Sequence, residues 1–227
     1  MKQNKIILEI RASEGGQDSK LLVEELTNIY LKSARLNNFT FEISDQRPGI
    51  CTIWLTGKGV KEYYTNESGC HRFIRIPPTE NRGRTHTSVI SVAITEPSQF
   101  SFNLDRSKVS KSYISSSGKG GQNVNRRSTC VQLTDEITGI QVKVQDKRTQ
   151  PENEVIAWKR LEEKIRESHK ENFNKKIYQD RFNQVGNSSR STKKRTYRIK
   201  EDTIIDHESG KVCSYKDFSR GKIELLS

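Results

Sequence analysis

The sequence predicts an α+β fold in two domains, built mainly from antiparallel strands and two helices. Three observations lead to this prediction: segments in which apolar and polar residues alternate, two segments with apolar residues every three or four positions, and a long polar stretch between them. The chain has 227 residues, a length that suits one large or two small domains. Only 31% of the residues are hydrophobic, so we expect small cores.

The N-terminal part contains most of the alternating segments. Residues 6–10 predict a strand, and a turn at residues 13–19 leads into a helix with Asp18 as its N-cap. The apolar side of this helix consists of Leu22, Leu26, Ile29 and Tyr30. Further alternating segments, which suit an antiparallel sheet with one buried face, lie at residues 40–43 with their neighbours, 51–55 and 88–94.

The C-terminal part begins with a polar stretch, residues 104–128, that predicts a loop. A hairpin is expected next, because two alternating segments flank a turn at residues 136–139. Pro151 then begins a long helix that reaches about residue 180, and its apolar side consists of Val155, Trp158, Leu161, Ile165, His169, Phe173 and Ile177. Residues 183–196 have linker composition, and short strand-like segments close the chain.

These boundaries predict a discontinuous first domain and a smaller, inserted second domain. The first is an antiparallel-sheet domain made of residues 1–103 together with residues 183–227. The second is an α+β domain of residues 104–182 that carries the polar stretch and the long helix.

The charge of the chain favours a nucleic-acid partner. Forty Lys and Arg face 28 Asp and Glu, a net charge of +12. Residues 106–127 contain six basic side chains and no acidic one, and residues 181–200 contain seven and none. The apolar runs are too short to span a bilayer and the N-terminus lacks a signal peptide, so we expect a cytoplasmic protein without a membrane partner.

The sequence does not indicate a metal site or a cofactor. The four cysteines, Cys51, Cys70, Cys130 and Cys213, are far apart and lack the spacing of a zinc site, so we interpret them as reduced structural thiols. The glycine-rich segment at residues 115–127 could cradle an anion through its backbone amides. It matches neither a Walker A loop nor a dinucleotide fingerprint, and a solvated surface loop is the alternative.

Four segments of the chain stand out, at residues 9–19, 66–88, 116–129 and 190–207. Together and in this order they resemble the bacterial-type class I peptide chain release factors, and the UAA/UAG-reading type most closely. Residues 116–129, with Gly-Gly-Gln at their centre, and the following hairpin resemble the hydrolytic domain of that family. Residues 66–88 resemble its codon-reading segment, residues 9–19 the adjoining loop and helix, and residues 190–207 its switch region and closing strands. Gly-Gly-Gln also occurs at residues 15–17, but there it precedes a helix.

The resemblance implies a role for each residue of the second Gly-Gly-Gln segment. Gly120 and Gly121 would shape the backbone, and the Gln122 amide would donate to the oxyanion that forms when water attacks the peptidyl-tRNA ester. In the family this glutamine is often N-methylated, so a glutamine methyltransferase is an expected partner. The general base would come from tRNA and ribosomal RNA. The chain would therefore promote hydrolysis only together with the ribosome, without a cofactor or a metal.

The resemblance also implies which residues read a stop codon. Pro77, Pro78 and Thr79 resemble the Pro-x-Thr tripeptide of UAA/UAG-reading factors, with Thr79 on the second base. His86 would stack between the second and third bases, and Thr87 would contact the third. The first uridine would be read through the backbone of Gly15, Gly16, Gln17 and Asp18. Phosphate contacts are expected from Arg72, Arg75, Arg82 and Arg84, with ordinary surface arginines as the alternative.

Contacts with ribosomal RNA or tRNA are expected from the basic side chains of the two acid-free stretches. These are Lys119, Arg126, Arg127, Arg190, Lys193, Lys194 and Arg195. His71, His169 and His207 are interpreted as structural.

Two departures from the family pattern lead to further expectations. Ile74 stands where UAA/UAG-reading factors have a glutamine, so we expect a bias towards UAA, with UAG weakened and UGA rejected by Thr79. The chain opens on the codon-reading segment, so the family's helical N-terminal domain is expected to be missing, which leaves coupling to a recycling GTPase open. Two alternatives remain: a factor that rescues stalled ribosomes without strict stop-codon dependence, and a basic RNA-binding module.

Overall fold

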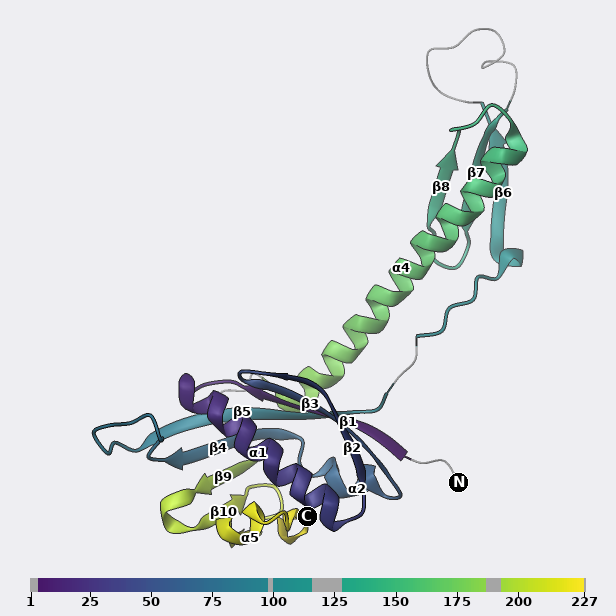
Figure 1. The fold of residues 1–227 in the computed structure, drawn as a ribbon. Coiled ribbons are helices and arrows are strands. Elements are labelled where there is room, and N and C mark those ends of the chain that lie inside the picture. The colour runs from purple at the N-terminus through teal and green to yellow at the C-terminus, as the bar shows by residue number, and fades with distance from the viewer. Residues whose placement is uncertain (1–3, 98–99, 116–127, 187–192, 227) are drawn as a thin grey trace. The chain divides into compact units, whose positions relative to one another are not determined.

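The computed structural model describes residues 4–97, 100–115, 128–186 and 193–226. The chain divides into two compact units, one of residues Met1–Ser98 with Tyr178–Ser227 and the other of residues Gln99–Ile177 (Figure 1). The mixed α+β class and the predominance of antiparallel strands confirm the predicted fold class.

The described residues of the first unit form an eight-stranded sheet in the order β11-β10-β9-β4-β5-β1-β3-β2. Every neighbouring pair in it is antiparallel except β4 and β9, which run parallel. The C-terminal segment of the chain therefore extends a sheet that the N-terminal segment begins. The strands are β1 (Asn4–Ala12), β2 (Thr40–Arg47), β3 (Ile50–Gly57), β4 (Gly69–Arg75), β5 (His86–Thr95), β9 (Arg195–Arg198), β10 (Thr203–Asp206) and β11 (Val212–Ser214).

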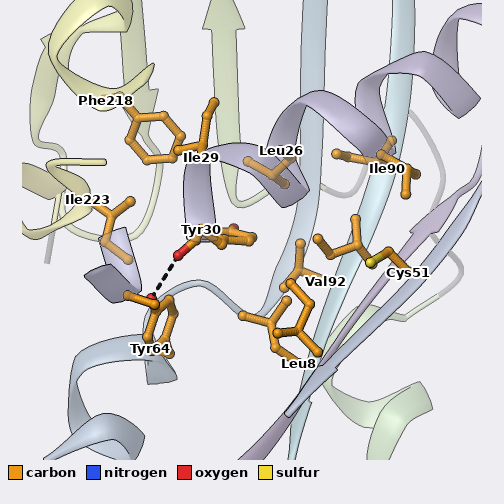
Figure 2. Close-up of a cluster of buried hydrophobic side chains, with 14 of the residues drawn as sticks. Leu8, Leu26, Ile29, Tyr30, Cys51, Tyr64, Ile90, Val92, Phe218 and Ile223 are labelled. Atoms are coloured by element: carbon orange, nitrogen blue, oxygen red, sulfur yellow. Dashed lines mark hydrogen bonds between the residues drawn. The ribbon is translucent and has the colours of Figure 1, made fainter. Parts of the chain in front are cut away.

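One face of this sheet is covered by helices, and the main core lies between the sheet and these helices. The longest of the helices on this face is α1 (Gln17–Leu36). The shorter ones are α2 (Val60–Thr65), α5 (Tyr215–Ser219) and the 3-10 turns η2 (Ile199–Glu201) and η3 (Ile223–Leu226). Figure 2 shows Leu8 and Val92 of the sheet facing Leu26 of α1, with Phe218 and Ile223 of the C-terminal segment near Ile29. The Tyr64 hydroxyl donates to the Tyr30 carbonyl at 3.2 Å.

The start of α1 differs from the prediction. The N-cap is Gly16, and no side chain caps the helix there with a hydrogen bond. Asp18 lies inside the first turn, and its side chain is buried. The prediction of Asp18 as the N-cap is therefore wrong. The reason is that the Asp18 carboxylate is engaged by groups from β4 and β5, as described below.

The second unit has its own small core. Its described strands, β6 (Val109–Ile114), β7 (Cys130–Asp135) and β8 (Gln141–Val144), form an antiparallel sheet in that order. The helix α4 (Gln150–Val185) packs on it with its first half, and η1 (Arg106–Lys108) precedes β6. The core consists of Val131, Leu133, Val142, Val144, Ala157, Leu161 and Ile165. The predicted hairpin is confirmed as β7 and β8.

Three sequence predictions need correction here. Residues 109–114 are not loop but the edge strand β6, whose mostly exposed side chains show no apolar alternation. The predicted linker 183–196 is helical up to Val185 and enters β9 at Arg195, because these residues contact the sheet of the first unit. Val155 is 71% exposed and does not belong to the buried side of α4, where Ala157 lies instead.

Candidate nucleic-acid interface

The turn that joins β1 to α1 is held against the beginning of β5. Ser13 N donates to the Val89 carbonyl at 3.0 Å, and Val89 N donates to the Glu14 carbonyl at 2.7 Å. Gly15 has a φ of +126°, and a Cβ on it would lie 2.4 Å from Ser88 Oγ and 2.9 Å from Ser88 Cα. Only glycine combines this backbone conformation with so close an approach of another strand.

A pocket opens where this turn meets β5. It has a volume of about 440 Å³ and is lined by Gly15, Gly16, His86, Thr87 and Ser88. Four of these were predicted from the sequence as codon-reading residues, although some 70 positions separate the glycines from His86. Antiparallel pairing of β1 with β5 brings the two segments together, since Ala12 lies opposite Ile90. Gln17 is exposed beside the turn.

A buried ion network lies behind the pocket. The Asp18 carboxylate accepts hydrogen bonds from Arg75 Nε at 3.0 Å, from Arg75 Nη2 at 2.7 Å and from Ser88 Oγ at 2.6 Å. Arg75 Nη1 donates to Glu25 of α1 at 2.5 Å, and Glu25 also accepts from the Tyr215 hydroxyl. Burial opposes the charge of Arg75, but the two carboxylates more than compensate and raise its pKa.

This network corrects one sequence prediction and adds residues that were missed. Arg75 is only 10% exposed and doubly paired, so the prediction that it contacts a phosphate is wrong. It fixes the glycine turn and α1 to β4. Ser88 and Glu25 were not singled out from the sequence. Ser88 stands at a core-facing position of an alternating segment, and a polar residue there could have been noticed.

The loop between β4 and β5 is ordered by one carboxylate. Glu80 Oε1 accepts from Arg82 N at 2.7 Å, and Glu80 Oε2 lies 3.2 Å from Arg84 Nη2 and 2.8 Å from His86 Nε2. The backbone hydrogen bond from Arg82, followed by the side chains of Arg84 and His86, lowers the pKa of Glu80. Glu80 thus holds His86, whose side chain is 43% exposed, at the edge of the pocket.

The predicted tripeptide lies on the same loop. Glu80 N donates to the Pro77 carbonyl at 3.0 Å, which closes a turn over Pro77, Pro78 and Thr79. Pro77 is buried, whereas Pro78 and Thr79 are exposed at the tip and do not line the pocket. Ile74, partly buried, is the cross-strand neighbour of Thr87.

The predicted RNA contacts of the returning segment differ in their accessibility. Lys193 is exposed, whereas Lys194 is only 10% exposed and pairs with Glu208 at 2.8 Å. Arg195 is fully buried: its Nη1 donates to Glu67 at 2.5 Å and its Nε to Asp206 at 2.8 Å. The prediction of Arg195 as an RNA contact is therefore wrong, because its charge fastens β9 to the turn before β4.

His71 belongs to the same buried region. Its Nδ1 lies 2.8 Å from the Tyr197 hydroxyl and its Nε2 lies 2.9 Å from the Glu67 carbonyl. Burial, and then the positive charge of Arg195, lower the pKa of His71 to about 3. The ring is therefore neutral at physiological pH, which fits the structural role that the sequence suggested.

The second Gly-Gly-Gln segment lies outside the described residues. This applies to Gly120, Gly121 and Gln122, and to the predicted RNA contacts Lys119, Arg126, Arg127 and Arg190. They stay predictions from the sequence.

The described residues give no sign of a metal centre or of a membrane span. Within residues 4–97, 100–115, 128–186 and 193–226, no group of three or more His, Cys, Asp or Glu side chains could hold a metal ion. All four cysteines are free, and three of them are buried. None of the helices in these same ranges is long and apolar enough to cross a bilayer.

Two family models match adjoining parts of the chain. The PCRF domain model matches residues 1–92, and the RF-1 domain model matches residues 98–208. The first match covers the glycine turn, the pocket and the loop between β4 and β5. The second covers the small sheet, α4, β9 and β10.

Similar proteins are found among both curated sequences and solved structures. Peptide chain release factor 1 of Myxococcus xanthus is 34% identical over 215 residues, which cover 92% of this chain and 59% of the relative. Peptide chain release factor 1 of Leuconostoc citreum is 34% identical over 212 residues, covering 90% and 59%. The structure of RF2 of Thermus thermophilus matches with a TM-score of 0.58 and 25% identity, covering 99% of this chain and 66% of that one.

The chain thus spans about 59% of the length of the curated relatives that it matches. The two matched domains follow each other along the chain, and the similar proteins are named release factors. The pocket between the glycine turn and β5 lies within the first matched domain. The chain belongs to the class I peptide chain release factor family.

Proposed function

We propose that the chain is a translation termination factor that reads a stop codon in the ribosomal A site and triggers hydrolysis of the peptidyl-tRNA ester in the peptidyl transferase centre. The observation that supports this proposal most is the pocket lined by Gly15, Gly16, His86 and Thr87. These residues come from two distant segments, both of which the resemblance to the release-factor family assigns to codon reading.

The chemistry of the pocket suits an unpaired RNA base. Sequence-specific RNA recognition uses bases that are unstacked, stacked on side chains such as histidine and hydrogen-bonded along their edges. His86 offers a half-exposed ring held by Glu80, Thr87 offers a hydroxyl group, and the glycine turn offers backbone groups without side chains. In this proposal the exposed Thr79 at the loop tip binds the second base and rejects UGA, while the turn from Gly15 to Asp18 binds the first uridine.

Hydrolysis is assigned to the Gly-Gly-Gln segment on the grounds of its sequence. The Gln122 amide would stabilise the oxyanion formed as water attacks the ester, and one such donor contributes a rate factor of about 10² to 10³. Gly120 and Gly121 would allow the backbone conformation that presents the amide. Since the general base comes from RNA, the isolated protein should hydrolyse nothing.

Domains and partners follow from these assignments. Residues 1–103 with 183–227 would form the codon-reading domain, and residues 104–182 the hydrolytic domain. The partners are the ribosomal RNA of both subunits, the stop codon, P-site peptidyl-tRNA and a methyltransferase that modifies Gln122. Lys193 and the basic residues of 116–127 and 187–192 would contact the RNA, and the site of action is the cytoplasm.

A peptide release assay tests the proposal. Ribosomes carrying labelled peptidyl-tRNA in the P site are programmed with UAA, UAG, UGA or a sense codon in the A site, and the full chain is added. We expect the fastest release on UAA, slower release on UAG, and background rates on UGA and the sense codon. Equal release on all four codons would contradict codon reading and indicate a rescue factor. RNA binding without release on any codon would leave only a binding module.

A further inference from the structure

Three side chains form a continuous row across neighbouring strands beside the pocket. Thr87 of β5 is the register partner of Ile74 of β4, and Ile74 is the register partner of Arg198 of β9. Partners in adjacent strands project from the same face of a sheet, and the strands are about 4.8 Å apart. Arg198 therefore lies on the same face as Thr87, two strands away from the pocket wall.

Arg198 is free to move towards a ligand on that face. Its side chain is 46% exposed, and its Nη1 pairs at 3.1 Å with Glu201, which is 61% exposed. Exposed ion pairs of this kind contribute little to the free energy of unfolding, so another acceptor can readily replace the Glu201 carboxylate. Arginine also has a rigid fork of donors on a long side chain, which suits planar acceptor pairs.

Ile74, which lies between Thr87 and Arg198 in this row, has no hydrogen-bonding group in its side chain. Ile74 is partly buried and offers an apolar surface against which a base can lie, but no polar contact to either purine. The resemblance to the family places a glutamine at this position, and its replacement by Ile74 is what implied a bias towards UAA. Arg198, next to Ile74 in the row, supplies the hydrogen-bonding group that Ile74 lacks, and its guanidinium can only donate.

On the basis of the proposed function, we propose that Arg198 is a specificity residue that reads guanine at the third position of the codon. Guanine presents two acceptors, O6 and N7, to a guanidinium, whereas adenine presents N7 beside a donor amino group. In unpaired RNA this edge of the base is accessible to side chains. Arg198 thus allows UAG to be read although Ile74 makes no polar contact with the third base.

Peptide release at subsaturating factor on UAA and UAG tests this assignment. Arg198→Ala should lower kcat/KM on UAG about tenfold, the effect typical of one bidentate contact to guanine, and change it less than about twofold on UAA. Arg198→Lys should lose less UAG activity than Arg198→Ala, because an ammonium group can also donate to O6 and N7 but lacks the rigid fork of the guanidinium. Arg220→Ala is the matched control, since Arg220 is also exposed and pairs with an acid three residues away.

A rescue variant makes the result independent of a general loss of RNA binding. Ile74→Gln combined with Arg198→Ala should recover UAG release, because glutamine carries both a donor and an acceptor. Equal losses on UAA and UAG, or none on UAG, would overturn the role of Arg198 while leaving the proposed function intact. A wild-type chain inactive on both codons would instead overturn the proposed function, and this assignment with it.

Discussion

At the scale of single residues, the pocket depends on the absence of a side chain at Gly15. Gly15→Ala would place a Cβ within 2.9 Å of the Ser88 backbone and require a φ of +126° from an L-residue. The turn would have to move away from β5, and such misplacement can cost about 100-fold in rate. We expect release on UAA at subsaturating factor to fall by that order, with binding to UAA-programmed ribosomes weakened in parallel.

Gly59→Ala is the control for backbone strain alone. Gly59 also has a positive φ, +77°, but a Cβ there would meet nothing within 4 Å, and it lies outside the pocket. This variant should retain release within about twofold. Similar losses in the Gly59 and Gly15 variants would mean that general strain, and not the close approach to Ser88, explains the effect.

A second residue-scale prediction concerns the stability of the first unit. The folded chain keeps His71 neutral down to a pKa of about 3, whereas an unfolded histidine titrates at its ordinary value of 6.5. The unfolded state therefore binds a proton that the folded state does not as the pH falls below 6.5. This contribution to stability is complete above pH 6.5 and is lost progressively towards pH 3, by about 1.4 kcal/mol per pH unit.

Urea unfolding at pH 7 and pH 5 measures this contribution. The contribution of His71 should lower the free energy of unfolding of the wild type by about 2 kcal/mol between pH 7 and pH 5. His71→Gln should be less stable at pH 7 but lose less on acidification. His169→Gln is the control, because His169 is exposed, and it should keep the slope of the wild type. An unchanged slope in His71→Gln would show that another group causes the acid sensitivity.

At the scale of elements, α4 stabilises the second unit through only part of the side that its sequence pattern predicts. Leu161 and Ile165 are buried against β7 and β8, whereas Val155 is 71% exposed. Leu161→Ala should cost about 2 to 5 kcal/mol, since it leaves a cavity in a small core. Val155→Ala should stay within about 0.5 kcal/mol. Hydrogen exchange of the β7 amides reports both, and equal loss of protection in the two variants would contradict the packing.

The elements with strong periodicity could be predicted from the sequence. The helix around Leu22 and Leu26, the hairpin of β7 and β8 and the long helix all follow from repeating apolar positions. The edge strand β6 could not, because an edge strand exposed along most of its length has no buried face to pattern. The short helix α2 also escaped prediction, since six residues give too few turns for a helical period.

The candidate site shows the same division. Gly15, Gly16, His86 and Thr87 were predicted and lie together around one pocket. The buried pairs were not predictable, because Arg75 and Arg195 look like surface cations in the sequence. Each of them pairs with a distant acid, Arg75 with Asp18, which is 57 positions away, and Arg195 with Glu67, which is 128 positions away. A basic residue that pairs across such a separation gives no local signal. Charge counts therefore overestimate the surface available to RNA.

At the scale of the whole molecule, the proposed codon reading and hydrolysis belong to different parts of the chain. The pocket belongs to the unit of residues Met1–Ser98 with Tyr178–Ser227, and the Gly-Gly-Gln sequence falls within Gln99–Ile177. A change in the second should therefore abolish hydrolysis without weakening recognition of the codon. The first unit also depends on its C-terminal segment, since Phe218 and Ile223 are fully buried in the core formed with α1.

The most direct test compares two substitutions of Gln122. Gln122→Ala keeps the backbone amide, whereas Gln122→Pro removes its hydrogen. Both variants should bind UAA-programmed ribosomes as tightly as the wild type. Release should be modestly slower with alanine and lower by about 10² to 10³ with proline. Release by the proline variant at close to the wild-type rate would contradict the account.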